Sequence, residues 1–173
     1  MRRFIPQIQP WIDEQELSYL QKVIDSTFVT ENELTKEFEK RVQELTGAKY
    51  TVAYTNGTAA LFGCFTALGI GPGDKVIVPN MTFVATANAV IMTGATPVFC
   101  EVDKKTFCID PEEIRKLLDK DTKAIVPVHL YGQAANMDEI LKIARENSLQ
   151  VVEDAAQGVG VKYKNQHVGT LSD

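Results

Sequence analysis

The sequence predicts an α/β fold, a three-layer sandwich in which helices cover both faces of a mostly parallel central sheet. From about residue 50 onward, helical patterns alternate with short runs of β-branched residues. Single helices between successive strands require parallel strands, because a right-handed crossover returns the chain to the same end of the sheet. Ligands bind outside the carboxyl ends of such strands, so residues just after each predicted strand are the first candidates for a site.

Two amphipathic helices are predicted before this alternating part of the chain. One spans 13–26 and the other spans 33–45, and Gly47 then provides a left-handed stop. Each helix carries an apolar face, which in the first helix consists of Leu17, Leu20, Val23 and Ile24.

The alternating part contains predicted strands at 50–54, 75–78, 96–102, 124–128 and 150–153. Helices are predicted between them at 59–68, 82–92, 111–118 and 137–147. The third of these helices has the clearest start, because Asp110 is a suitable N-cap, Pro111 suits the first position and Glu113 completes a capping-box pattern. A small hairpin is expected near the end of the chain, turning at Lys164 and Asn165.

The composition is that of an ordinary globular domain, with 45% hydrophobic and 24% charged residues. The net charge of −5 is spread without blocks of like charge, so we expect no nucleic acid as a partner. No apolar run suits a signal peptide or a membrane span, which predicts a cytoplasmic protein without membrane association. Three cysteines without a C-x-x-C spacing and only two histidines predict no metal site.

The segment 55–60 leads from a predicted strand directly into a predicted helix. Free N–H groups and the positive end of a helix bind anions, Gly57 allows a ligand to approach the backbone, and Thr58 adds a hydroxyl donor. A phosphate group would fit this place. The alternative is structural, with a tight turn at Asn56 and Gly57 and with Thr58 as the helix cap.

Two carboxylates, Glu153 and Asp154, end the last predicted strand, and Gln157 follows them closely. A buried carboxylate at the mouth of a parallel sheet is costly unless it has a positive partner. A protonated pyridine nitrogen is such a partner, and Asp154 would keep it charged so that the ring of pyridoxal phosphate (PLP) can take up electrons. The alternative for Asp154 is a solvated turn or a helix cap.

Two further segments follow predicted strands. Phe83 stands at the start of a predicted helix, where a flat ring can stack on a flat cofactor, although a core position is the alternative. His129 and Gln133 follow the strand that ends at residue 128, and we predict that both form hydrogen bonds to substrate. The alternative for His129 is a structural side chain whose nitrogens are both satisfied.

In this order, these segments resemble the DegT/StrS family of PLP-dependent nucleotide-sugar aminotransferases, which have the fold of aspartate aminotransferase. The resemblance covers nearly the whole chain. It is carried by the motifs NGTAAL (56–61), LGIGPGDKVIVP (68–79), TFVAT (82–86), GATPVF (94–99), PVHLYGQ (127–133), EDAAQ (153–157) and VGT (168–170).

The resemblance implies a role for each cofactor-binding candidate. Gly57 and Thr58 would hold the PLP phosphate, Phe83 would stack on the ring, Asp154 would pair with the pyridine nitrogen and Gln157 would face the phenolic oxygen. The family transfers an amino group from glutamate to a keto carbon of a nucleotide-linked deoxysugar. The resemblance also implies a homodimer, because family sites are completed by residues of the neighbouring subunit.

The chain departs from the family pattern at residues 28–33, where substrate contacts are expected, and it lacks the Schiff-base lysine, which the resemblance places beyond Asp173. We therefore predict no catalytic residue within the chain and an inactive 1–173 segment. Residues 1–48 are expected to form an N-terminal helical segment that packs on an incomplete large PLP-binding domain, 49–173. The small C-terminal domain would be absent.

Two alternative functions remain at this stage. Related enzymes with histidine at the lysine position are PLP-dependent sugar dehydratases. A truncated, non-catalytic family member would act as a binding or regulatory module.

Overall fold

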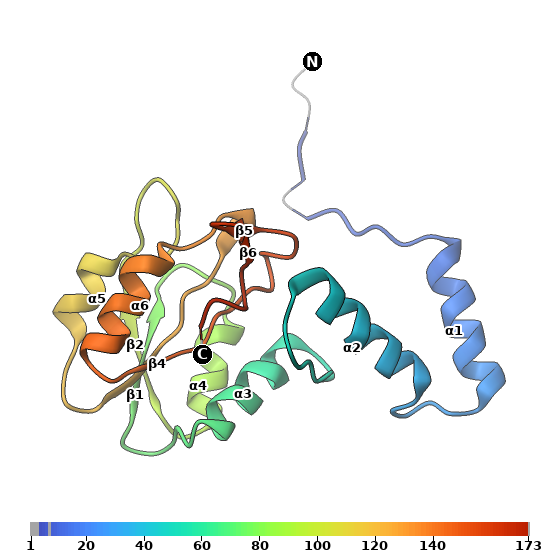
Figure 1. Ribbon diagram of the computed structural model, residues 1–173, viewed down its shortest axis with the longest axis horizontal. Coiled ribbons are helices and arrows are strands. Elements are labelled where there is room, and N and C mark those ends of the chain that lie inside the picture. The colour runs from blue at the N-terminus through green and yellow to red at the C-terminus, as the bar shows by residue number, and fades with distance from the viewer. Residues whose placement is uncertain (1–3, 7, 173) are drawn as a thin grey trace. The chain divides into compact units, whose positions relative to one another are not determined.

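The computed structural model describes residues 4–6 and 8–172, so that residues 1–3 and 7 of the predicted N-terminal segment and Asp173 lie outside the described part (Figure 1). The chain divides into two compact units, one ending at Phe38 and one beginning at Glu39. Phe38 and Glu39 lie in the same helix, so the first part of that helix belongs to one unit and the rest to the other. The expected division at residues 48 and 49 stays a prediction about the full-length protein.

The N-terminal unit contains α1 (Glu14–Ser26) and the first part of α2 (Glu33–Thr46). A reciprocal capping box between Asp13 and Glu16 starts α1, in agreement with the predicted beginning of this helix. The predicted stop after α2 is also present, because Gly47 adopts a φ of 78°. Neither helix has a buried residue, so most of the predicted apolar side chains are solvent-exposed within the described chain and the others are half-buried.

The second unit is built on a parallel sheet whose strands lie in the order β2-β1-β3-β4, which confirms the predicted fold class. The strands comprise β1 (Lys75–Pro79), β2 (Thr96–Cys100), β3 (Thr122–Ile125) and β4 (Gln150–Val151). β1 is one residue longer than predicted, and the other three are shorter than predicted. From β1 the chain passes to β2 on one side, then returns to the other side of β1 for β3 and β4. The strand order thus reverses between β1 and β3.

This reversal places helices on both faces of the sheet. The connection β1 to β2 contains α4 (Ala85–Met92), while the connections in the opposite direction contain α5 (Pro111–Leu117) and α6 (Met137–Glu146). Right-handed crossovers that run in opposite directions lie on opposite faces. Figure 1 shows α5 and α6 together on one face, and α4 packs with α3 (Gly57–Ala67) on the other.

Alternate strand residues supply the two cores that join these layers. Ile77 and Ile125 belong to the core under α5 and α6, whereas Val76, Val78 and Ala124 belong to the core under α3 and α4. Side chains of a strand point alternately to its two faces, so the continuous apolar run of β1 serves both cores.

The predicted strand over 50–54 is wrong, since these residues are assigned to no strand and pair with none in the described chain. Glu39 holds this extended segment through its carboxylate, which accepts the Ala53 N–H at 2.8 Å, and through its carbonyl oxygen, which accepts the Thr51 hydroxyl. An apolar, β-branched sequence forms a strand only when a neighbouring strand accepts its hydrogen bonds, and here none does.

Two local predictions have different outcomes. Asp110 caps α5 as predicted, but it binds the N–H of Glu112, and Glu113 pairs with Lys116 instead of completing a capping box. The hairpin is confirmed as β5 (Lys162–Tyr163) and β6 (Gln166–His167), with positive φ at both turn residues.

Glu153 anchors the last described residues of the chain to the end of the sheet. Its carboxylate accepts the N–H groups of Gly169, Leu171 and Ser172 at 2.7–2.8 Å and also contacts His129 Nε2 at 3.0 Å. Burial alone raises the pKa of Glu153, but the hydrogen bonds from His129 and from these backbone groups outweigh it and lower the pKa. The carboxylate is therefore charged in the interior and fully used within the chain.

None of the helices in the described ranges has the length and apolarity that crossing a membrane requires.

Replacing Phe65 with alanine is expected to lower the free energy of unfolding by about 3–5 kcal/mol, since its fully buried ring fills the core under α3 and α4. Urea unfolding followed by circular dichroism measures this loss. The matched control is Phe99→Ala, which removes a ring that is 58% exposed and should cost less than about 1 kcal/mol. Equal losses in the two variants would contradict the described core.

Glu153→Gln is expected to lower the free energy of unfolding by about 2–3 kcal/mol at pH 7, because it removes the charge that accepts these hydrogen bonds. The folded pKa lies below the unfolded value of about 4.3. Stability from this group is therefore complete above the unfolded pKa and is lost as the pH falls through the folded pKa.

Urea unfolding at pH 7, 5 and 4 tests this direction of the pKa shift. The difference in free energy of unfolding between wild type and Glu153→Gln should shrink only at the acidic end of the series. Glu101→Gln is the matched control, because Glu101 is exposed, and it should change stability by less than about 0.5 kcal/mol at each pH. A difference that grows on acidification is incompatible with a lowered pKa.

Candidate functional site

A cavity of about 260 Å³ lies at the carboxyl edge of the sheet, where the strand order reverses between β1 and β3. Its walls come from the start of α3 and from the segments that follow β1, β3 and β4. This is the place where open α/β sheets bind ligands. All the predicted cofactor-binding residues line it, namely Gly57, Thr58, Phe83, Asp154 and Gln157.

The first wall is the N-terminus of α3, which begins at Gly57 and not at Ala59 as predicted. Asn56 caps this helix, since its side chain accepts the Ala59 N–H at 2.9 Å. Thr58 is therefore not the cap, and its hydroxyl has no partner within the described ranges. The backbone N–H groups of Gly57 and Thr58 are likewise without acceptors there. Two amides and a hydroxyl are thus available to an anion.

A Cβ atom added to Gly57 would meet no heavy atom within 4 Å, and the backbone there does not have positive φ. The hydrogen of this glycine therefore leaves open space beside the free N–H groups. An anion can approach the backbone at this point.

The second wall is the carboxylate of Asp154, which is 8% exposed. The backbone of Asp154 is fixed by parallel bonds with the chain after β3, because its N–H binds Pro127 O and its carbonyl accepts the His129 N–H. Its side chain accepts the Thr86 hydroxyl at 2.8 Å and the Ala156 N–H at 3.2 Å. The alternative of a solvated turn is wrong, because the carboxylate is buried.

Both donors to Asp154 are neutral. Among the side chains that the structure describes, no lysine, arginine or histidine pairs with this carboxylate. An isolated buried carboxylate is costly in an apolar medium, and this cost is relieved by a positive partner. The site is thus complementary to a ligand that brings a cation or a charged N–H group to Asp154.

Phe83 and Gln157 complete the wall between these two ends. Phe83 is 68% exposed, so the core alternative is wrong and the ring is free to cover a flat ligand. The Gln157 side-chain oxygen accepts the Tyr131 N–H at 3.2 Å, which leaves its NH₂ group as a donor beside the cavity.

The two predicted substrate-binding residues do not line this cavity. His129 is fully buried, where Nδ1 accepts the Ala135 N–H at 3.2 Å and Nε2 faces Glu153. An acceptor role for Nδ1 requires the proton on Nε2, so the ring is neutral and donates to Glu153. Both nitrogens are used within the chain, as in the structural alternative. Gln133 is exposed outside the cavity.

Sequence reasoning assigned no function to Thr82, which lines the cavity, or to Thr86, which lies behind it. Thr82 lines the wall, and its hydroxyl is 3.3 Å from that of the fully buried Thr86, which in turn binds Asp154. The available signal was two threonines spaced four residues apart in the segment that follows β1. Their contact with residue 154 could not be read from this spacing.

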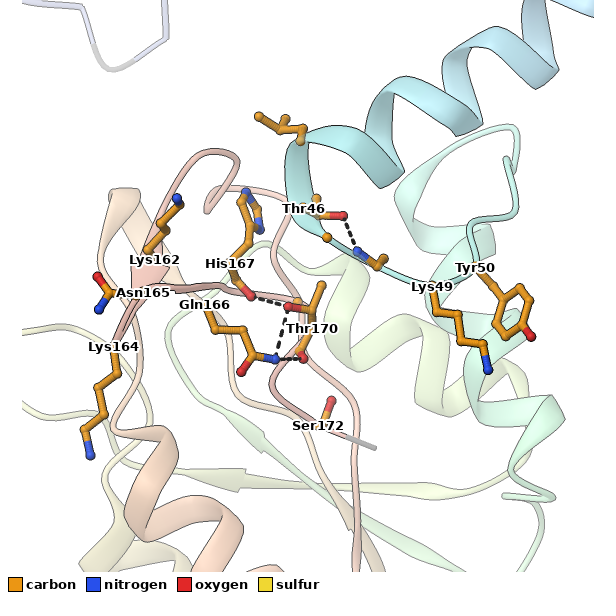
Figure 2. A pocket seen from close by; sticks show the side chains of 14 residues that line it. Thr46, Lys49, Tyr50, Lys162, Lys164, Asn165, Gln166, His167, Thr170 and Ser172 are labelled. Carbon is orange, nitrogen blue, oxygen red and sulfur yellow. Dashed lines mark hydrogen bonds between the residues drawn. The ribbon is translucent and has the colours of Figure 1, made fainter.

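A larger hollow, of about 920 Å³, lies elsewhere in this unit, between residues 45–50 and 162–172 (Figure 2). Several of its polar side chains are engaged with the chain itself, since Gln166 forms hydrogen bonds with Thr170 (Figure 2). Lys164 pairs with Asp138. None of the predicted site residues lines this hollow.

The smaller cavity combines free N–H donors, an exposed aromatic ring and an uncompensated carboxylate. These groups suit a ligand that carries a phosphate at one end, a flat ring and a protonated ring nitrogen at the other. Its volume is near the lower end of the range for small-molecule pockets, about 300–1,000 Å³, which also suits a single-ring ligand.

Comparisons with known proteins agree with this chemistry. The chain is 44% identical over 165 residues to GDP-perosamine synthase from Caulobacter vibrioides, covering 95% of this chain and 44% of that protein. It is 42% identical over 170 residues to the spore coat polysaccharide biosynthesis protein SpsC from Bacillus subtilis, covering 98% of this chain and 44% of that protein. The chain thus spans less than half the length of these relatives.

A solved structure is also similar, that of NtdA from Bacillus subtilis with bound cofactor PMP. The TM-score is 0.82 at 39% identity, with 86% of this chain and 34% of that chain covered. Residues 10–173, nearly the whole sequence, match a single family of enzymes. The chain belongs to the DegT/DnrJ/EryC1/StrS aminotransferase family.

Proposed function

We propose that this chain is the cofactor-binding part of a PLP-dependent aminotransferase that acts on a nucleotide-linked keto sugar. The observation that carries the proposal is the cavity in which a buried carboxylate without a cationic partner lies in one pocket with the open N-terminus of α3. When bound, PLP supplies an electron-withdrawing ring that carries the amino group between donor and acceptor.

The described residues fit this cofactor at each end. Gly57 and Thr58 bind the phosphate through free N–H groups and a hydroxyl, and the partial positive charge of the α3 N-terminus favours the anion. Asp154 accepts the N–H of the protonated pyridine ring, which replaces the missing cationic partner.

The remaining walls orient the ring. Phe83 covers one face of it and limits the access of water. Gln157 donates from its NH₂ group toward the phenolic oxygen, because its carbonyl oxygen is already bound to Tyr131. His129 acts indirectly, since it donates to Glu153 and thereby supports the strand end from which Asp154 projects. Gln133 stays a prediction for substrate contact.

Several finer points extend to the full-length protein. The names of two relatives, GDP-perosamine synthase and a spore coat polysaccharide biosynthesis protein, support a nucleotide-linked sugar as the amino acceptor. Glutamate as the amino donor, assembly as a homodimer and a cofactor-binding lysine beyond Asp173 are proposals that rest on the family resemblance.

The first test measures cofactor affinity without covalent attachment. Pyridoxamine 5′-phosphate needs no lysine, so its dissociation constant reports the cavity alone in the full-length protein, followed by ligand fluorescence. Asp154→Asn should weaken binding about tenfold or more, because the charged acceptor is lost. Pyridoxamine without phosphate should bind far more weakly than the phosphate ester.

The matched control is Asp138→Asn, which alters a half-exposed carboxylate that pairs with Lys164 away from the cavity and should bind the ligand as wild type does. Unchanged affinity in Asp154→Asn, or equal affinity for the phosphorylated and unphosphorylated ligands, would disprove the proposed function.

The second test uses the open space at Gly57. Gly57→Ala should leave the thermal midpoint of unfolding unchanged, because the new methyl group meets no protein atom within 4 Å, yet it should weaken pyridoxamine 5′-phosphate binding about tenfold or more by filling the anion site. Gly71→Ala is the matched control, because its added Cβ would lie 3.8 Å from Thr93 O, outside the cavity. If Gly57→Ala and Gly71→Ala have the same affinity for pyridoxamine 5′-phosphate, the phosphate does not bind at the N-terminus of α3.

A further inference from the structure

Two linked hydroxyl groups, one buried and one half-buried, lead from the cavity wall to Asp154. Thr86, in the first turn of α4, is fully buried, and its Oγ1 lies 2.8 Å from Asp154 Oδ2. Thr82, in the loop before α4, has its Oγ1 at 3.3 Å from Thr86 Oγ1. The hydrogen bond between Thr86 and Asp154 joins residues that are 68 positions apart in the chain.

The direction of these hydrogen bonds follows from the number of protons. A charged carboxylate only accepts, so Thr86 donates its single hydroxyl proton to Asp154. Thr86 then has no proton left for Thr82, so Thr82 must donate to Thr86. Both donations point toward the carboxylate, and each bond of such a chain polarises the next.

The two oxygens of Asp154 are thereby held by different parts of the chain. Oδ2 accepts from Thr86 on α4, and Oδ1 accepts the N–H of Ala156, two residues further along. The plane of the carboxylate is fixed by two donors on separate elements. Neither donor carries charge, so both hold the carboxylate in place and leave it without a cationic partner.

We propose that Thr86 is a positioning residue for the cofactor, which holds the carboxylate of Asp154 oriented toward the pyridine nitrogen so that this nitrogen stays protonated. The inference rests on the proposed function and extends it to a residue that lies behind Asp154. Thr82 reinforces this effect by donating to Thr86.

A role in packing alone predicts a different outcome. Valine has nearly the shape of threonine, so Thr86→Val removes the donor to Asp154 and retains the volume in the core. If Thr86 only fills space or satisfies burial, its loss changes stability but not the position of the proton on the bound ligand. If Thr86 positions Asp154, its loss lets the carboxylate turn away from the ring nitrogen. The ring nitrogen then loses its anionic partner and gives up its proton more readily.

The experiment uses the full-length protein and pyridoxamine 5′-phosphate labelled with ¹⁵N in the ring, whose chemical shift distinguishes a protonated from a neutral pyridine nitrogen. Wild type should show the protonated signal at neutral pH. Thr86→Val should bind about tenfold more weakly and move the signal toward the neutral form. Thr86→Ser, which retains the hydroxyl, should restore both the affinity and the signal.

Thr93→Val is the matched control, since Thr93 caps the same helix at its other end. Its hydroxyl donates to Val90 O and accepts the Ala95 N–H, so neither readout should change. Thr82→Val is the second variant, because it leaves the bond between Thr86 and Asp154 in place and should shift the signal less, in the same direction. If Thr86→Val does not fold, the ring ¹⁵N signal of Thr82→Val tests the positioning role instead.

An unshifted signal in folded Thr86→Val overturns the positioning role, as does an unshifted signal in Thr82→Val when Thr86→Val fails to fold. Weakened binding in Asp154→Asn together with an unaffected Thr86→Val overturns only the role of Thr86. Full binding in Asp154→Asn overturns the proposed function itself, so the two failures are distinguishable.

Discussion

The buried carboxylate of Asp154 is the constraint on which the site depends. The reversal of strand order opens the carboxyl edge between β1 and β3, and the chain after β4 places a charge there. Within the described residues this charge receives only neutral donors, from Thr86 and Ala156. A folded site that retains such a charge is complementary to a ligand with a positive ring nitrogen, and the open N-terminus of α3 supplies the place for the opposite end of that ligand.

Much of this arrangement could be predicted because it follows from local rules. Residues at the carboxyl ends of parallel strands meet at one edge, so the positions of Phe83 after β1 and Asp154 after β4 were enough to place them together. Gly57 lines the same cavity although the strand predicted before it does not form. The capping box of α1 and the turn of the β5–β6 hairpin also depend only on neighbouring residues.

Several features that the sequence did not reveal depend on distant partners. The apolar residues 50–54 have strand character, but no described strand pairs with them, and Glu39 holds them instead. The enclosure of His129 by Ala135 and Glu153, and the contact of Thr86 with Asp154, arise from packing between elements far apart in the sequence. No spacing rule records such contacts.

Glu153 and Asp154, the consecutive acidic residues that follow β4, have different hydrogen-bond partners. Glu153 accepts hydrogen bonds from His129 and from three backbone N–H groups, whereas Asp154 receives only two neutral donors within the described residues. Because successive strand residues point to opposite sides, sliding β4 by one position would exchange the two acids, leaving the anchoring amides of residues 169–172 facing the wrong side chain. The two acidic residues that follow this short strand therefore specify its alignment against β3. In most strands, buried apolar residues determine the alignment.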